Sequence, residues 1–230
     1  MTSNLILDAL PPDELAALRP ALVRRTVSKG EVLIRQGSIV REVHFPVTAD
    51  IANVLILVDG AVTEISSVGR DGVTGLAAFL ADAPIGWEAV VRTAGEVMAV
   101  SADLLRAHVR GSPRMLELLL RVTHHNQIES GQIGACNTHH AIEQRMARWL
   151  LTLADRTGGD RMEVTQEDLA EALGVRRTSV TSAAVGLKAD GSIRYSRGVI
   201  VIDHPALEQH ACDCYAALAQ RRREGGVPLA

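Results

Sequence analysis

Hydrophobic and polar positions follow two different patterns along the chain. From Leu22 to Val100, short β-branched runs are separated by turn residues, which is typical of a β-barrel or jelly roll. The runs that we expect to form strands are residues 32–34, 43–45, 54–58, 62–65, 89–91 and 97–100. Asp59-Gly60, between two of these runs, predicts a two-residue hairpin turn. A short proline-led helix should precede the strands and end before Pro20.

After residue 111 the apolar positions recur at spacings of three and four, which indicates helices. A long helix opened by Pro113 carries these apolar positions: Met115, Leu118, Leu119, Val122, Ile128, Ile133 and Cys136. One side of it would pack on the β-rich part and the other side on a second copy of the helix. Gly131 and Gly134 weaken the helix by about 1 kcal/mol each relative to alanine, yet they let a partner helix approach closely. We expect a hinge at Asn137-Thr138.

Residues 164–189 predict two short helices joined by a glycine turn. Thr165 and Asp168 form a variant capping box that begins the first helix. Gly174 provides the backbone freedom that the turn needs. The second helix should begin near Arg177. Its apolar stripe is Val180, Ala184 and Leu187, and its opposite face carries Thr178, Thr181, Ser182 and Val185.

A cationic hairpin follows this pair of helices. The apolar runs 192–195 and 199–202 flank Ser196-Arg197-Gly198, so a cation lies at the predicted tip. Between residues 174 and 202 there are five basic residues and one acidic residue. Arg177 can pair with guanine O6 and N7 through two hydrogen bonds. The stretch therefore predicts a winged helix-turn-helix that binds double-stranded DNA, with an ordinary solvated helical hairpin as the alternative.

Composition supports this division of the chain. The net charge is −3, but up to residue 137 there are twelve basic and fifteen acidic residues, and after it twelve of each. The acidity thus lies away from the predicted DNA-binding surface. Three cysteines without a disulfide framework, the lack of a charged-then-apolar N-terminus and the lack of an apolar run near 18 residues predict a cytoplasmic protein without membrane segments. A further helix over residues 141–155 should bury Trp149.

Three motifs resemble the Crp/Fnr superfamily of bacterial transcription regulators: residues 145–151, 173–177 and 193–198. The resemblance covers nearly the whole chain and implies an α+β fold. Its parts would be a β-roll or jelly-roll sensory domain similar to cyclic-nucleotide-binding domains (1–111), a dimerisation helix (112–137) and a winged helix-turn-helix DNA-binding domain (138–230). The family works as homodimers on two-fold operators whose half-sites lie about 34 Å apart. RNA polymerase would be a further partner.

The resemblance and the residue pattern together assign two sets of candidate residues. Those expected to contact DNA are Thr165, Gln166, Arg176, Arg177, Thr178, Ser179, Thr181, Ser182, Lys188 and Arg197. Those expected to form the dimer contact are Met115, Leu118, Leu119, Val122, His125, Ile128 and Ile133. Thr178 and Ser182 stand where better-known members have a glutamate and an arginine, so the half-site should differ from the familiar one.

The sensory region lacks the charged residues that hold a cyclic phosphate in the family. That cassette pairs Gly-Glu with a later Arg-Ser or Arg-Thr. Here Thr74-Gly75 and Ile85-Gly86 stand in their places, and Arg92-Thr93 imitates the motif at a strand edge. We therefore expect no binding of cyclic AMP and predict no cofactor. The roll either binds an unknown small-molecule effector or binds nothing. Residues 69–72 are expected to form a turn with a surface ion pair.

The remaining chemistry-bearing residues leave alternatives open. The pairs His124-His125 and His139-His140 lie about 22 Å apart along a helix, so a haem- or metal-sensing regulator would need a dimer to bring histidines together. Cys212 and Cys214 follow His210 without an evident fourth ligand, so we expect free thiols and assign no metal site. No nucleophile, phosphate-loop or metalloprotease motif is present.

We therefore expect no enzyme. The rival from another class is a cupin-like enzyme with a helical tail, for which only His44 stands on a predicted strand. Residues 205–220 predict a terminal helix, followed by a solvated basic tail at residues 221–224.

Overall fold

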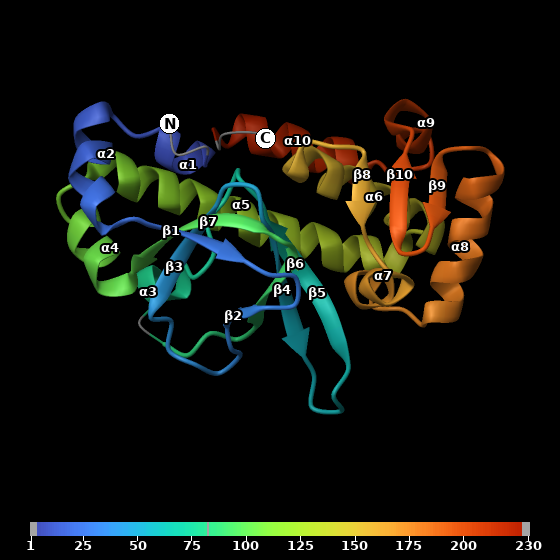
Figure 1. Ribbon diagram of the computed structural model, residues 1–230, viewed down its shortest axis with the longest axis horizontal. Coiled ribbons are helices and arrows are strands. Elements are labelled where there is room, and N and C mark those ends of the chain that lie inside the picture. The colour runs from blue at the N-terminus through green and yellow to red at the C-terminus, as the bar shows by residue number, and fades with distance from the viewer. Residues whose placement is uncertain (1–3, 82, 227–230) are drawn as a thin grey trace.

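A long helix, α5 (Pro113–His139), carries a β-roll beside one half and a small helical domain beside the other (Figure 1). The computed structural model describes residues 4–81 and 83–226. The predicted α+β fold, with an N-terminal roll, a long helix and a C-terminal winged helix-turn-helix, is confirmed.

Two antiparallel sheets form the roll, with strand orders β1-β7-β3 and β2-β6-β4-β5. Their strands are β1 (Val23–Val27), β2 (Val32–Ile34), β3 (Glu42–Pro46), β4 (Asp50–Ile56), β5 (Val62–Val68), β6 (Glu88–Thr93) and β7 (Gly95–Ser101). The six predicted strands are present. Strand β1 was not predicted, because its two arginines interrupt the apolar run. The turn at Asp59-Gly60 is longer than expected, since residues 57–61 connect β4 to β5.

Short helices cover the ends of the roll. They are α1 (Leu5–Asp8), α2 (Pro12–Leu18), the 3-10 turn η1 (Arg19–Ala21), α3 (Ala77–Leu80) and α4 (Ala102–Val109). The expected proline-led helix is α2. The inner face of α5 completes the core of the roll, where Met115, Leu118 and Leu119 are fully buried beside Phe45. Burial of each such side chain contributes roughly 1.5–3 kcal/mol, so the first half of α5 belongs firmly to the roll.

The C-terminal domain packs four helices against a small sheet of order β8-β10-β9. Its elements are α6 (Ile142–Thr157), β8 (Arg161–Glu163), α7 (Gln166–Leu173), α8 (Arg177–Ala189), β9 (Ile193–Ser196), β10 (Val199–Ile202) and α9 (His204–Glu208). Thr165 caps α7 as predicted: its Oγ1 accepts from the Asp168 amide at 3.1 Å, and the Asp168 carboxylate accepts from the Thr165 amide at 2.8 Å. Gly174 ends α7 with φ 60°, the left-handed conformation that favours glycine.

The chain changes direction at two places that differ from our expectation. Helix α5 continues through Asn137 and Thr138, and the bend into α6 comes at residues 140–141, which have extended backbones. The expected single terminal helix is two helices, because residues 209–213 break it into α9 and α10 (Cys214–Glu224). This break turns α10 back along α5 toward the roll (Figure 1).

Candidate nucleic-acid interface

The outer face of α8 is exposed and carries small side chains. Thr178, Thr181 and Ser182 are all exposed, while the predicted apolar stripe is buried in the domain core. Val185, on the same outer face, is 62% exposed. An exposed methyl-bearing side chain among hydroxyls suits contact with a thymine methyl group in the major groove.

The hydroxyl groups of this face are bonded to their own helix. Thr181 Oγ1 donates to the Arg177 carbonyl at 3.1 Å, and Ser182 Oγ donates to the Thr178 carbonyl at 3.2 Å. Each hydroxyl keeps acceptor lone pairs and can rotate toward another partner. The hydroxyl groups of this face therefore have hydrogen-bond partners in the absence of DNA, and they can exchange these bonds for bonds to base edges.

The first residues of α7 and α8 are joined by a side-chain hydrogen bond. Arg177 Nε donates to Gln166 Oε1 at 3.1 Å. This bond orients the Arg177 side chain, whose two terminal nitrogens make no hydrogen bond to any residue within 4–81 and 83–226. The free end of the guanidinium is the part that pairs with guanine or phosphate.

A groove of about 350 Å³ lies between α8 and the β9–β10 hairpin, which is the predicted wing. Its lining comprises Gln166, Thr181, Ala184, Val185, Lys188, Tyr195, Ser196, Arg197 and Gly198. Arg197 and Gly198 form the hairpin tip with φ 49° and 78°, the conformation of a tight two-residue turn. Lys188 on the helix and Arg197 on the wing place a cation on each side of the groove. We call Gln166, Arg177, Lys188 and Arg197 the α8–wing surface.

Three other predicted DNA-contacting residues do not line this groove. Thr165 uses its side chain to cap α7. Arg176 is exposed and Ser179 is half-buried, and both line a hollow between α7 and the β4–β5 hairpin of the roll. Arg176 and Ser179 are thus set apart from the groove beside the wing, whereas the Thr165 methyl group lies 3.8 Å from the position that a Cβ on Gly198 would take at the hairpin tip.

Helix α7 is docked on the roll, a contact that sequence reasoning missed. Lys29 Nζ lies 2.7 Å from Asp168 Oδ2 and donates to the Glu163 carbonyl at 3.1 Å. Burial raises the pKa of Asp168, but hydrogen bonds from Lys29 and Thr165 outweigh burial and hold it below its ordinary value. Lys29 lies in a turn more than 130 residues before α7, so no local sequence pattern indicates the ion pair between Lys29 and Asp168.

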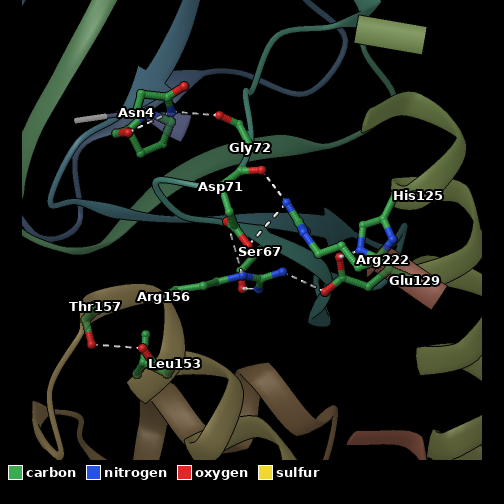
Figure 2. A network of polar contacts seen from close by, with 11 residues as sticks. Asn4, Ser67, Asp71, Gly72, His125, Glu129, Leu153, Arg156, Thr157 and Arg222 are labelled. Carbon is green, nitrogen blue, oxygen red and sulfur yellow. Dashed lines mark hydrogen bonds and ion pairs between the residues drawn. The ribbon is translucent and has the colours of Figure 1, made fainter. Parts of the chain in front are cut away.

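A buried ionic network joins the roll to the C-terminal domain (Figure 2). Arg156 of α6 donates to Glu129 of α5 at 2.9 Å and to the hydroxyl of Ser67. Asp71, in the loop after β5, lies 3.9 Å from Arg156 Nε and 3.2 Å from Arg222 Nη2. We call Asp71, Glu129, Arg156 and Arg222 the interdomain ion network.

Two predictions for this region are wrong. Asp71 was expected in a surface ion pair, but it is only 5% exposed. Burial raises its pKa, and Arg222 and Arg156 outweigh burial, so its pKa is lowered and it stays ionised. Arg222 was expected in a solvated tail, but it is 7% exposed within α10. The physical reason is the break before α10, which returns this arginine to the roll.

A second buried pair lies where β5 and β6 meet α6. Arg92 Nη2 lies 2.7 Å from Glu64 Oε2, and its guanidinium lies 5.3 Å from the centre of the Trp149 ring. Trp149 Nε1 donates to Glu64 Oε1 at 3.0 Å. Trp149 is buried as predicted, and it also links the two domains.

The residues at the expected cassette positions serve the roll itself. Thr74 exchanges backbone hydrogen bonds with His44, and its Oγ1 donates to Asn53 Oδ1 at 3.4 Å. Gly75 has φ 91°, and Ile85 is 2% exposed and donates its amide to the Ser38 carbonyl. None of these groups presents a charge.

The side chains assigned to the dimer contact face inward. Met115, Leu118, Leu119 and Val122 lie in the core of the roll, Ile133 is buried, and His125 lies beside the interdomain ion network. Ile128 is only half-buried. Residues committed to the core of their own subunit are not available to a partner. The apolar spacing identified the helix correctly, and most of the residues that it selected lie within their own subunit.

The histidines and cysteines group differently from their spacing in the sequence. His124 and His139 are exposed, while His210 lies 2.8 Å from Asp190 and away from the cysteines that follow it. Cys212 and Cys214 instead meet Cys136 of α5 and His140, which directly follows α5. His44 is buried in the roll and lies 3.7 Å from Glu42.

Within the described part of the chain, the Cys136, His140, Cys212 and Cys214 cluster is the single group of three or more His, Cys, Asp or Glu side chains able to hold a metal ion. In the same part of the chain, no helix is both long and apolar enough to cross a lipid bilayer.

Comparisons with known proteins agree with this architecture. Residues 24–111 match the cyclic nucleotide-binding domain family, and residues 144–210 match the Crp-like helix-turn-helix domain family. No curated protein matches the chain.

Solved structures share the whole fold. FixK2 from Bradyrhizobium japonicum is 17% identical with a TM-score of 0.71, and the match covers 83% of this chain and 98% of FixK2. CLP from Xanthomonas campestris, described as a c-di-GMP responsive global regulator, is 16% identical with a TM-score of 0.69, covering 84% and 99%. TTHB099, a transcriptional regulator of the CRP family from Thermus thermophilus, is 21% identical with a TM-score of 0.67, covering 81% and 96%. The two domain families, in this order and on this fold, show that the chain belongs to the Crp/Fnr superfamily of transcription regulators.

Proposed function

We propose that the protein is a homodimeric transcription regulator that binds a two-fold DNA operator and catalyses no reaction. The carrying observation is the α8–wing surface: an exposed face of small hydroxyl side chains, an arginine with a free guanidinium end, and a groove with a cation on each side. α8 would enter the major groove, and Lys188 and Arg197 would contact phosphates. Thr178, Thr181 and Ser182 would read base edges, with Arg176 and Thr165 near the backbone.

The proposal divides the chain at the boundaries expected from the sequence, with a sensory roll (1–111), a dimerisation helix (112–137) and a DNA-binding domain (138–230). Such a regulator would work in the cytoplasm, with RNA polymerase as a further partner.

The dimer contact would use the outer face of α5. An exposed stripe there follows the three-and-four spacing of a helix pair. Its members are Leu116, Leu120, His124, Gln127, Gly131, Gly134 and Thr138. Leu120 is 49% exposed, and nothing within 4 Å stands where a Cβ would extend from Gly131 or Gly134. A second copy would cover the leucines and approach closely at the glycines.

The roll would not respond to cyclic AMP. A buried phosphate needs a guanidinium partner, and its absence costs several kcal/mol. Arg92, the arginine of the imitating motif, is engaged with Glu64 and Trp149. The proposal rests on the C-terminal DNA-binding domain, so it is compatible with an effector of other chemistry in the roll.

Selection of bound duplexes from a random pool tests the function directly. We expect a two-fold consensus whose half-sites are about one helical turn apart, with or without cyclic AMP. Sedimentation of the wild type should give a dimer, and Leu120→Arg should give a folded monomer with weakened operator binding. Leu104→Arg is the matched control, since Leu104 of α4 is also exposed, at 53%. A monomeric wild type, or a pool without any enriched sequence, would contradict the proposal.

A further inference from the structure

Four side chains meet where α5 ends and α10 begins. One potential ligand atom from each of Cys136, His140, Cys212 and Cys214 lies within 4.8 Å of all the others. We call these residues the Cys3His cluster. Cys136 Sγ lies 3.5 Å from Cys212 Sγ, and Cys214 Sγ lies 3.5 Å from His140 Nδ1. All three cysteines are reduced and buried.

These separations are within about 1 Å of those in a tetrahedral metal site. With a Zn–S bond of about 2.3 Å, neighbouring sulfur atoms around a tetrahedral ion lie about 3.8 Å apart. Side-chain movements of about 1 Å would bring the whole cluster to that geometry. Three thiolates and one imidazole form a known structural zinc set, and a thiolate-rich tetrahedral set selects this ion over Mg²⁺ or Ca²⁺.

The local structure explains why residues so far apart in the chain come together here. Cys136 lies in the last turn of α5, and His140, the first residue after the helix, donates its amide to the Cys136 carbonyl at 3.0 Å, which keeps the two residues close together. The break at residues 209–213 brings the other two cysteines onto that face. Gln132, one turn earlier, donates its amide to Cys214 Sγ at 3.1 Å and accepts from Arg221 at 2.7 Å. Such outer contacts orient the ligands of metal sites.

The charges around the cluster favour an anionic centre. Arg145 and Arg148 of α6 are buried, and neither has a carboxylate within ion-pair distance in residues 4–81 and 83–226. The Nε atoms of both arginines are buried without a hydrogen-bond partner among the described residues. A buried guanidinium requires a compensating charge. Zn²⁺ with three thiolates and a neutral imidazole carries a net charge of −1, whereas three neutral thiols supply no charge.

We propose that the Cys3His cluster binds one Zn²⁺ ion. The three thiols would release their protons to solvent on binding, and the imidazole would coordinate through Nδ1. The ion would clamp the start of α10 to the end of α5, across the bend at residues 140–141. Arg145 extends this clamp, because its guanidinium donates to the carbonyl of Leu173 at the helix-turn-helix turn.

Metal analysis of the reduced full-length protein, purified from zinc-supplemented cells, tests the site. We expect one zinc per chain, displaced when the three thiols are titrated with a mercurial. Cobalt(II) added to the metal-free protein should give the d–d and thiolate charge-transfer bands of a tetrahedral site. His140→Ala should weaken zinc binding by more than about 100-fold, beyond the loss typical of outer-shell partners. His139→Ala is the matched control, since the adjacent exposed histidine should keep wild-type affinity.

Three results would overturn the proposal: reduced wild-type protein that takes up no zinc at saturating zinc, equal affinities for the His140→Ala and wild-type proteins, or a Cys136–Cys212 disulfide in protein kept under reducing conditions. The mercurial titration uses the wild type, so the test holds even if a variant does not fold. None of these measurements involves DNA, so their outcome is separate from that of the proposed function.

Discussion

The α8–wing surface and the interdomain ion network both depend on arginine, yet they place it in opposite environments. The residues of the surface come from one stretch, 166–198, and its cations are exposed and unpaired with any carboxylate of the described residues. The network gathers residues from a loop, α5, α6 and α10, and its guanidinium groups are buried against carboxylates. An exposed, unpaired arginine can meet an external anion. A buried, paired one holds domains together.

The largest expected effect comes from breaking the network. Arg156→Ala leaves Asp71 and Glu129 with less compensating charge in a buried site, so the free energy of unfolding should fall by about 3–5 kcal/mol. Urea unfolding measures it. Arg24→Ala is the control, because Arg24 pairs with Glu96 at the surface, where a pair contributes about 1 kcal/mol or less. Similar losses for both variants would contradict the distinction between the two environments.

The next effect concerns base reading by the α8–wing surface. Arg177→Ala should weaken operator binding by about 1–3 kcal/mol and relax the preference at one base pair, because the bidentate contact to guanine is lost. Competition binding with single-base operator variants measures this. The unfolding free energy should stay near the wild-type value, since Arg177 is exposed. An unchanged base preference would contradict the expectation that Arg177 contacts a base.

A smaller effect should appear in acid. Burial lowers the pKa of His125 to about 4; Arg222 and Arg156 act in the same direction, while Glu129 and Asp71 oppose them. This pKa lies below the value of 6.5 for histidine in the unfolded chain. The free energy of unfolding is therefore highest above pH 6.5, and the contribution linked to neutral His125 is lost as the pH falls toward 4. Between pH 7 and 4, wild-type stability should fall by about 1–2 kcal/mol more than that of His125→Gln. His124→Gln, next to it and exposed, should keep the wild-type pH dependence.

The smallest effect is expected at the wing. Arg197→Ala should weaken binding to specific and non-specific DNA alike and reduce the slope of log affinity against log salt by about 0.9, the value for one phosphate contact. Gel shifts over a salt series measure the slope. A loss confined to one base pair would instead make Arg197 a base reader.

Local signals in the sequence were enough to predict the DNA-binding half. The capping box at Thr165, the turn glycine and the α8 stripe each act within four residues, and the structure places all three as expected. The strands of the roll were also predicted, because alternation and turn residues are local.

Contacts between distant segments could not be predicted. Arg222 pairs with Asp71 across 151 positions, and Cys136 meets Cys212 across 76. Helix α5 adds a different lesson. Apolar residues stand on both of its faces, so periodicity alone could not tell that Leu118 belongs to the roll and Leu120 to the exposed stripe.

The unbroken length of α5 has a mechanical consequence. Its 27 residues make a helix about 40 Å long. One end of this helix packs in the core of the roll, and the other end is joined to the C-terminal domain. A tilt of only about 5° at the fixed end would shift the far end by roughly 3.5 Å, a tenth of the distance of about 34 Å between successive major-groove contacts. In the proposed dimer, a small rearrangement in the roll would therefore decide whether the two DNA-binding domains are in register with a duplex.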